Sequence, residues 1–336
     1  MKLKELVEIC YGKNQRDVET DFSDIPILGT GGIIGYAAKA LYNEESVLIG
    51  RKGTIGMPFY INKPFWTIDT LFYTKINQRL IIPKYLYYLL CTIGLTRYSE
   101  GAAVPSLTTK TLYEIELEVP NKETQQHIVN TIGSVDDLIE NINKQNEKLL
   151  HIGLTLINGL NDSLQHQKLS SICELVKGFE IGSQKYIETP IDKSLIHYLR
   201  VGDLLSLGST FVKPSDELML CSDDDVLIAF DGAPGRNAIG LDGAYSSGIY
   251  KVRCKPKYKG LIYFEINSEL NQKIIKDHSQ GTTILHASKA IPFLETAKVD
   301  DKKTEKLNVL FERIINNKKK LKLLNNEKRL LLSKYF

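Results

Sequence analysis

The sequence contains an internal repeat, and this repeat limits the possible folds more than any other feature. Residues 47–56 read VLIGRKGTIG, and residues 226–235 read VLIAFDGAPG, 179 positions later. Residues 101–104 (GAAV) are similarly echoed by residues 281–284 (GTTI), 180 positions later. Two matches in the same order and at nearly the same offset are hard to explain by chance. We therefore expect one structural unit to occur twice.

Each half of the repeat ends in a long helical pattern. The first pattern opens at Asn121, a good N-cap residue, and the second opens near Asp300. Apolar residues recur at spacings of three and four, which indicates the seam of a coiled coil. The seam residues are Ile128, Ile132, Val135, Ile139, Ile142, Leu149, Leu156 and Leu160 in the first pattern, and Leu307, Leu310, Ile314, Leu321, Leu324 and Leu331 in the second. A long amphipathic helix packed on a domain is the simpler interpretation, but its occurrence in both halves favours the coiled coil.

Polar residues interrupt both seams. Asn146 lies in the first seam, and Asn317 and Lys328 lie in the second. Polar seam residues often determine the register of paired helices at some cost in stability.

The segments before the helical patterns predict mixed globular domains. Short β-type runs occur at residues 47–49, 115–119, 226–230 and 248–252, and helical spacing occurs at residues 83–91 and 261–275. The fold class is therefore α+β, with two mixed α/β domains separated by two long helices. We place the divisions at residues 1–119, 120–163, 164–299 and 300–336.

Several classes of protein are disfavoured by the residues. Lys52 precedes its glycine, which is the wrong order for a P-loop, and no helical period follows the glycines as a dinucleotide fold requires. The five cysteines are scattered without a C-x-x-C pair, so neither a disulfide framework nor a metal site is predicted. No apolar run is long enough to span a membrane and no signal peptide is seen, so we expect a cytoplasmic protein.

Charge is unevenly distributed along the chain. The net charge is only +3, but residues 301–336 carry 11 basic and 4 acidic residues, whereas residues 127–167 carry 2 and 5. This balance argues against DNA binding that is driven by charge alone. The basic run at residues 318–322 is consistent with contacts to DNA phosphates or to an acidic partner, or with pairing to the acidic first helix.

The order of the motifs resembles the specificity subunits of type I restriction–modification systems, over essentially the whole chain. The stretches that carry the resemblance are residues 11–15 (YGKNQ), 31–36 (GGIIGY), 50–56 (GRKGTIG), 64–66 (PFW), 69–70 (DT), 105–107 (PSL), 119–120 (VP), 125–128 (QQHI) and, in the second half, 198–204 (YLRVGDL). The second helix departs from the pattern, since no Pro-x-x-x-x-Gln-Gln precedes Leu307.

The resemblance implies a protein without chemistry of its own, with no catalytic residues and no cofactor bound by this chain. Two target-recognition domains would lie at the ends of an antiparallel helix pair, each reading one half of a split target in double-stranded DNA, about 34–36 Å apart. Two methyltransferase subunits would bring S-adenosylmethionine and modify adenine. Restriction subunits would add cleavage that requires ATP and Mg.

Residues suited to reading DNA are found in the loops. Arg and Lys read guanine, Asn and Gln read adenine, and Ser and Thr are adaptable. Our candidates are Lys13, Asn14, Gln15, Arg16, Arg51, Lys52, Thr54 and Ser106 in the first half, and Lys177, Lys185, Arg200, Arg236, Asn237, Ser247 and Lys289 in the second. Each is equally compatible with a solvated surface or turn position, and more of them would contact phosphates than bases.

Three further features have two interpretations each. Trp66 is suited to stacking on DNA, although a core position is the simpler expectation. Asp69 is able to accept a hydrogen bond from cytosine or to cap a turn. Residues 223–225 (DDD) suggest either a metal site or a solvated turn.

Two other functions compete with DNA recognition. A self-sufficient methyltransferase or nuclease is disfavoured, because the sequence has no Asn-Pro-Pro-Tyr-like motif and no nuclease pattern of paired carboxylates with a lysine. The alternative that stays open is a coiled-coil adaptor whose domains bind proteins and do not read DNA.

Overall fold

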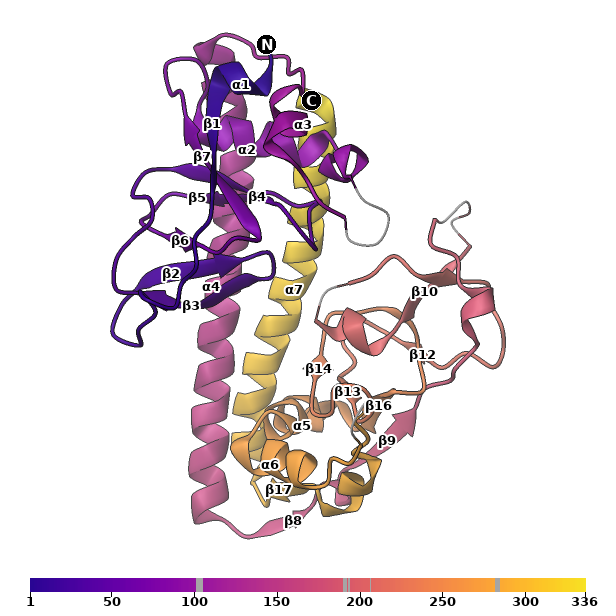
Figure 1. Ribbon diagram of the computed structural model, residues 1–336. Helices are drawn as coiled ribbons and strands as arrows, with labels where there is room; N and C mark the ends of the chain where they lie inside the picture. The colour runs from indigo at the N-terminus through magenta and orange to yellow at the C-terminus, as the bar shows by residue number, and fades with distance from the viewer. Residues whose placement is uncertain (101–104, 190–191, 193, 206, 282–284) are drawn as a thin grey trace. The chain divides into compact units, whose positions relative to one another are not determined.

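The computed structural model divides the chain into two compact units (Figure 1). It describes residues 1–100, 105–189, 192, 194–205, 207–281 and 285–336. Unit 1 contains Met1–Leu138 and Asn325–Phe336, and unit 2 contains Ile139–Leu324. The long helices α4 (Lys122–Ser163) and α7 (Asp301–Tyr335) each contribute to both units. The predicted echo between residues 101–104 and 281–284 falls largely outside the described residues.

Unit 1 is built on an antiparallel sheet of four strands. The order is β1 (Val7–Tyr11), β7 (Leu71–Ile76), β4 (Ser46–Gly50) and β5 (Phe59–Ile61). Every residue of β4 is buried, because helix α2 (Pro83–Thr92) packs on it. The remaining helices of the unit are short: α1 (Leu3–Leu6), η1 (Leu95–Tyr98) and α3 (Thr109–Tyr113).

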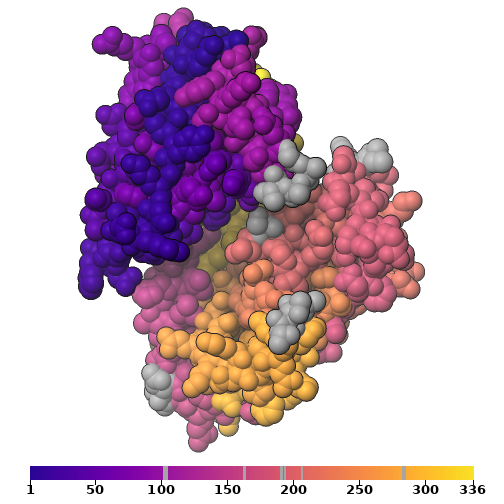
Figure 2. All heavy atoms as spheres, viewed as in Figure 1, coloured from indigo at the N-terminus to yellow at the C-terminus, as the bar shows by residue number. Residues whose placement is uncertain are grey.

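A smaller sheet of unit 1 contains β3 (Gly32–Ala37), β2 (Ile25–Gly29) and β6 (Trp66–Thr67). Its β2–β3 hairpin is labelled in Figure 1 and belongs to the indigo region of the space-filling view in Figure 2. Ile33, Ile34 and Tyr36 are exposed on β3.

The strand that we predicted at residues 115–119 is wrong. Only Glu116 forms a bridge, with Lys2. The backbone N–H of Leu3 donates to Ile115 O and that of Leu117 donates to Met1 O, but helix α1 then turns the neighbouring chain away. A helix cannot extend the ladder, so pairing stops after one bridge.

Unit 2 repeats the main sheet of unit 1. The order β9 (Cys173–Lys177), β16 (Ile249–Cys254), β13 (Leu227–Ala229) and β14 (Asn237–Ala238) is again antiparallel throughout. Helix α5 (Lys259–Ile266) occupies the position of α2 in the repeat. The predicted helix at 261–275 is in fact two helices, because Ser268 caps α6 (Glu269–Asp277) by accepting from the backbone N–H of Asn271.

The other elements of unit 2 form a second sheet and several short turns. The second sheet has the order β11 (Phe211–Val212), β10 (Ile196–Leu199), β15 (Gly243–Tyr245) and β12 (Leu220–Cys221). A two-stranded sheet pairs β8 (His166–Lys168) with β17 (Glu295–Ala297). The 3-10 helices are η2 (Leu169–Ser171), η3 (Ser183–Lys185), η4 (Val201–Leu204), η5 (Pro256–Tyr258) and η6 (Ser288–Phe293).

The backbone confirms the predicted repeat. Lys52 bridges Ser106 in unit 1, and Asp231 bridges His286 in unit 2, at offsets of 179 and 180 positions. Hydrogen bonds recur at the same places: Leu107 N donates to Arg51 O at 2.9 Å, and Ala287 N donates to Phe230 O at 2.7 Å. Gly53 and Gly232 are also equivalent, with φ of 78° and 75°, in the left-handed region that glycine tolerates best.

The two long helices run antiparallel. In unit 2, Asn317 Nδ2 donates to Asn146 Oδ1 at 2.8 Å, and in unit 1 Lys328 Nζ lies 2.7 Å from Asp136 Oδ1. Also in unit 1, Tyr335 Oη lies 3.4 Å from His127 Nε2. Within that unit the partner on α7 rises in number as the partner on α4 falls, so the two helices run antiparallel there. The polar residues that interrupt the predicted seams therefore form pairs between the helices. Asn146 pairs with Asn317, and Lys328 pairs with Asp136.

The predicted cap of the first helix is confirmed, and the second helix, which we expected to begin near Asp300, is capped by that residue. Asn121 Oδ1 accepts from Thr124 N at 2.9 Å, and Asp300 Oδ1 accepts from Lys303 N at 2.7 Å. The glutamine motif at the start of α4 has a structural role, because the buried Gln125 accepts from Ile82 N and donates to the carbonyls of Leu80 and Pro120. In the second helix the buried Thr304 lies 179 positions later.

One part of the predicted seam is wrong. Leu156 is 43% exposed, and α4 instead packs through Gly153 and Ile157. A Cβ at Gly153 would lie 2.1 Å from Phe264 Cε1, so a ring of α5 fills the space that a seam side chain would take. The steps from Leu149 to Gly153 to Ile157 are four residues each, which follows a straight helix on a globular core better than a heptad.

Two lysines of the basic run of α7 pair with loops of unit 2 and not with α4. Lys319 lies 3.2 Å from Asp223 and Lys322 lies 2.6 Å from Asp242, both in loops of the unit 2 sheets. Our suggestion that this run pairs with the acidic first helix is therefore wrong for these two lysines, because the loops of the second domain reach them.

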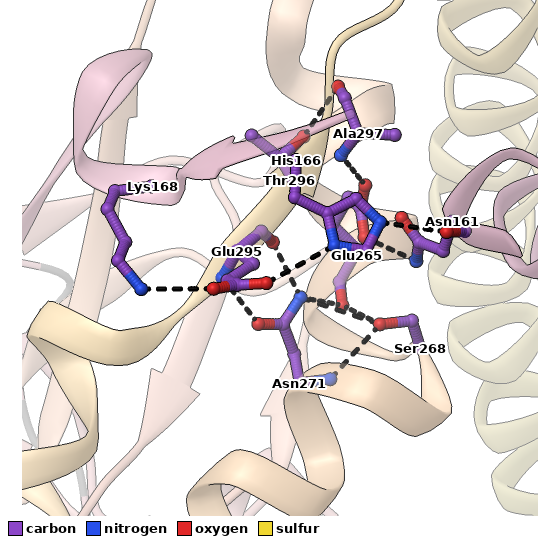
Figure 3. Close-up of polar contacts among 9 residues, drawn as sticks. All are labelled: Asn161, His166, Lys168, Glu265, Ser268, Asn271, Glu295, Thr296 and Ala297. Atoms are coloured by element: carbon purple, nitrogen blue, oxygen red, sulfur yellow. Dashed lines mark hydrogen bonds and ion pairs between the residues drawn. The ribbon is translucent and has the colours of Figure 1, made fainter. Parts of the chain in front are cut away.

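A buried polar network anchors the end of α4 in unit 2 (Figure 3). The carboxylate of Glu265 is fully buried and accepts from Ala297 N at 2.8 Å and from Asn161 Nδ2 at 3.2 Å. His166 lies between Asn161 O, at 2.9 Å from its Nε2, and Glu295 Oε2, at 3.2 Å from its Nδ1. Burial raises the pKa of Glu265 above its usual value.

Candidate nucleic-acid interface

In unit 1 the candidate residues gather where strands β1, β4 and β7 end or begin. We call this the loop edge of unit 1, and it comprises residues 12–16, 51–56, 67–70 and 105–106. The loops touch through their backbones: Gly12 N donates to Leu71 O, and Lys13 N donates to Thr67 O. A Cβ at Gly12 would lie 1.9 Å from Ile68 O, so only glycine allows this approach.

Arg51 is the best-supported side chain of this edge. Its guanidinium donates from Nη1 to Asp69 O at 3.1 Å and lies 5.2 Å from the centre of the Tyr11 ring. The side chain is half-buried, so these contacts orient it before any ligand binds. Lys52 and Thr54 in the same loop are exposed. These residues lie in the turn that joins the antiparallel strands β4 and β5.

The remaining candidates of unit 1 lie beside this turn. Asn14 Oδ1 accepts from Arg16 N at 2.9 Å, which makes a turn that presents Lys13, Asn14 and Arg16 to solvent. Gln15 is half-buried, and its carbonyl accepts from the backbone of Val18. Ser106 Oγ donates to Glu100 O at 3.1 Å.

Unit 2 has an equivalent loop edge, which comprises residues 178–179, 231–236, 246–248 and 285–289. Gly178 takes the role of Gly12, since its N–H donates to Ile249 O and a Cβ there would lie 2.2 Å from Ser246 O. Lys177 is exposed at the end of β9, with its Nζ 5.9 Å from the centre of the Tyr250 ring. Ser247 is half-buried in the turn, and Lys289 is exposed.

Arg236 and Asn237 are less available than we expected. Arg236 Nη1 donates to Val201 O at 3.3 Å, and the side chain is half-buried. The amide of Asn237 exchanges two hydrogen bonds with that of Asn267, at 3.0 and 3.1 Å. These contacts give Asn237 a structural partner between β14 and the end of α5, so a role in reading bases stays an untested prediction.

Arg200 and Lys185 lie together in another part of unit 2, beside the second sheet. The guanidinium of Arg200 lies 5.6 Å from the centre of the Tyr186 ring, and both Arg200 and Lys185 are exposed. Burial raises the pKa of Tyr186 to about 12, with Glu180 adding to the effect, so the phenol is neutral near neutral pH. Lys185 also lines a cavity of about 400 Å³ with Lys213 and Leu218.

The features with two interpretations are mostly resolved by their contacts. Trp66 is 6% exposed and its Nε1 donates to Lys13 O at 2.9 Å, which makes it a core residue that supports the loop edge. Asp69 is exposed, and its backbone carbonyl accepts the hydrogen bond from Arg51.

The acidic run at residues 223–225 forms a turn whose carboxylates pair with lysines. Lys259 lies 2.6 Å from Asp224 and lowers the pKa of that carboxyl. Across the described ranges, His, Cys, Asp and Glu side chains nowhere gather in the threes that a metal ion would require.

Sequence reasoning missed three residues of the loop edges. Tyr11 supports Arg51, and His286 Nδ1 lies 2.8 Å from Asp231 Oδ1 in the second unit. The alignment of the repeats held part of the signal, since it places Asp231 opposite Lys52. The contact of Asp231 with His286 could not be predicted, because the two residues lie 55 positions apart in the sequence.

A comparison with protein families finds a match to the first part of the chain. Residues 1–151 match the model described as "Type I restriction modification DNA specificity domain". This part of the chain is therefore similar to that family. The matched residues include unit 1 up to its helix α4 and continue into the portion of α4 that lies in unit 2.

Curated relatives of this part of the chain are named as specificity subunits. The "Type I restriction enzyme MjaIX specificity subunit" of Methanocaldococcus jannaschii is 34% identical over 120 residues, which is 34% of this chain and 28% of that protein. The "Type I restriction enzyme EcoprrI specificity subunit" of Escherichia coli is 27% identical over 118 residues, or 35% and 29% of the two chains. The matches thus span less than a third of these two relatives' length.

A solved structure shares the fold of the whole chain. The S subunit of a type I restriction-modification system from M. genitalium has a TM-score of 0.57 at 17% sequence identity, covering 100% of this chain and 95% of that one. The likeness is one of fold, and it covers both units. Within the part of the chain that the structure describes, every helix is too short or too polar to cross a lipid bilayer.

Proposed function

We propose that this chain is the DNA-specificity subunit of a type I restriction–modification complex, and that each unit reads one half of a bipartite target. The chain is non-catalytic by itself in this proposal. It directs two methyltransferase subunits, which use S-adenosylmethionine to methylate adenine, and restriction subunits, which use ATP and Mg. The family match supports recognition of DNA over an adaptor that binds only proteins.

The observation that carries the proposal is the pair of loop edges. Their backbones are equivalent. Arg51 O accepts a hydrogen bond from the backbone 56 positions later, and Phe230 O accepts one from the backbone 57 positions later. Their side chains differ, because Arg51 and Lys52 stand where unit 2 has Phe230 and Asp231. One scaffold that presents different groups is suited to reading two different half-targets, since base edges differ in their donors and acceptors.

The experiment that tests the proposal is a map of methylated bases. The chain is co-expressed with the methyltransferase encoded beside it, and the host DNA is sequenced by a method that reports methyladenine. We expect a split motif with two defined halves and an unread gap. Replacement of residues 1–118 by those of a relative should change one half only.

Three results would contradict parts of this proposal. A contiguous motif would mean that only one unit reads DNA. No motif, with an active and bound methyltransferase, would favour the adaptor. Methylation or cleavage of DNA by the pure chain would exclude a non-catalytic subunit.

Replacing Arg51 with alanine should weaken DNA binding by the complex, whereas an adaptor would be unaffected.

A further inference from the structure

The two loop edges differ most in charge at one equivalent pair of positions. In unit 1, Lys52 in the loop after β4 forms an isolated β-bridge with Ser106. In unit 2, the equivalent bridge joins Asp231 and His286. The neighbouring hydrogen bonds, from Leu107 N and Ala287 N, show that the backbones correspond. Unit 1 therefore presents a cation where unit 2 presents a carboxylate.

Asp231 is held in place rather than freely solvated. Its Oδ1 accepts from His286 Nδ1 at 2.8 Å, and the bridge between the two residues fixes their backbones. The Asp231 side chain is 22% exposed and that of His286 is 61% exposed. Within the described ranges no donor reaches the second oxygen of Asp231, so one acceptor of a positioned carboxylate is left for a ligand.

A carboxylate on a DNA-binding surface needs a specific reason. Phosphates repel it, so it contributes nothing to binding that depends on backbone charge. It gains energy from a base that offers an exocyclic amino group in the major groove. Asp and Glu accept from cytosine N4, whereas Arg and Lys donate to guanine O6 and N7.

We propose that Asp231, positioned by His286, selects cytosine in the half-target read by unit 2, by accepting from its N4 amino group in the major groove. The inference rests on the proposed function and adds to it the chemistry of one base pair in the half-target of unit 2. His286 is a positioning residue, which acts through Asp231.

The test measures methylation motifs for Asp231→Ala and Asp231→Asn in the complex with the methyltransferase. In the wild-type map, one position of the unit 2 half-target should be a C·G base pair, because Asp231 accepts from cytosine N4. In Asp231→Ala that position should become degenerate, with discrimination reduced about 5- to 150-fold. Asp231→Asn should shift the preference toward adenine, because an amide is suited to pair with it.

His286 requires a readout that a merely structural role would not move. His286→Ala should loosen the preference at the same base pair and at no other. His286→Asn, which keeps a donor near Asp231, should restore part of that preference. The matched control is Asp242→Ala, since Asp242 is an exposed carboxylate of the same unit that pairs with Lys322 on α7. We expect its motif to equal that of the wild type.

The outcomes separate this inference from the proposed function. A bipartite wild-type motif that is unchanged in both Asp231 variants would overturn the inference and leave the proposed function in place. Loss of methylation at all sites by a folded Asp231→Asn protein would overturn it too, because base selection predicts relaxation at one position. No wild-type motif would overturn the proposed function itself, and with it this inference.

Discussion

Single glycines allow the loops of each unit to meet. Gly12 and Gly178 are equivalent in the repeat, and each brings its backbone within reach of a carbonyl of the opposite loop. A methyl group at either position would lie 1.9 or 2.2 Å from an oxygen, inside any allowed contact. The geometry of the loop edges therefore depends on residues that have no side chain.

We predict that Gly12→Ala lowers the free energy of unfolding by about 1–3 kcal/mol, the usual cost of overpacking. Urea denaturation followed by circular dichroism measures this change. Gly31→Ala is the control, because no atom lies within 4 Å of a Cβ there. Equal stability of the two variants would show that the close approach of the Gly12 loop is absent in solution.

The buried Glu265 makes stability depend on pH. Burial raises its pKa above 4.5, so the folded chain holds more protons than the unfolded chain as pH rises above that value. The contribution of Glu265 to stability is therefore full below the unfolded pKa and falls as pH rises through the folded pKa. Groups with lowered pKa values, such as Asp224, have the opposite slope.

We predict that Glu265→Gln removes this slope. Relative to the wild type, the variant should gain stability between about pH 5 and about pH 8, because it has no proton to lose. Denaturant unfolding at both values, with the two proteins compared at each, isolates the effect since all other groups are shared. A difference in stability that stays constant with pH would contradict the raised pKa.

At the scale of elements, the two long helices are aligned by polar residues within an apolar seam. Asn146 and Asn317 meet at 2.8 Å, and Asn317 is 3% exposed. Such a pair contributes little net energy but disfavours other registers, because a shifted helix would bury each amide against apolar groups. Heptad spacing alone was sufficient to predict which residues interrupt the seam.

We predict that Asn317→Ala destabilises the protein by about 1–3 kcal/mol, because it leaves the amide of Asn146 without its partner. Asn316→Ala, one position away and exposed, should cost far less. The double variant with leucine at positions 146 and 317 should recover the lost stability, since both polar groups are then removed. Urea midpoints provide the comparison, and a double variant weaker than Asn317→Ala would contradict this account.

At the scale of the whole molecule, each compact unit is completed by a distant part of the chain. Unit 1 includes the end of α7, where Leu331, Leu332 and Tyr335 pack against the unit 1 core. Lys328 adds an ion pair with Asp136 in the same unit. The last turns of α7 thus stabilise the unit that is farthest from them in sequence.

We predict that a chain ending at Leu324 loses stability selectively in unit 1. Hydrogen exchange should become faster in β1, β4 and β7, whereas β9, β13 and β16 should keep their protection. A chain that ends after Arg329, and so keeps Lys328 but lacks the apolar residues, serves as an intermediate control. Faster exchange in both sheets would show that the protein unfolds as one cooperative body.

Local patterns in the sequence determined the repeat, the helix caps and most of the seam. The N-cap at Asn121, the start of the second helix near Asp300 and the strand around Leu48 were predicted because their hydrogen bonds and burial depend on neighbours in the chain. The family resemblance was likewise carried by short motifs, including the pair Gln125-Gln126. The side-chain amide of Gln125 ties α4 to the loop before α2.

Only the tertiary structure decided which distant side chains meet. Gly153 carries the seam because Phe264, 111 positions later, fills its place, and Asn237 pairs with Asn267 from another element. The contact between Asp231 and His286 depends on how two loops 55 positions apart close over the sheet. Periodicity records which face of a segment is apolar, but the partner of a polar side chain is set by the path of the whole chain.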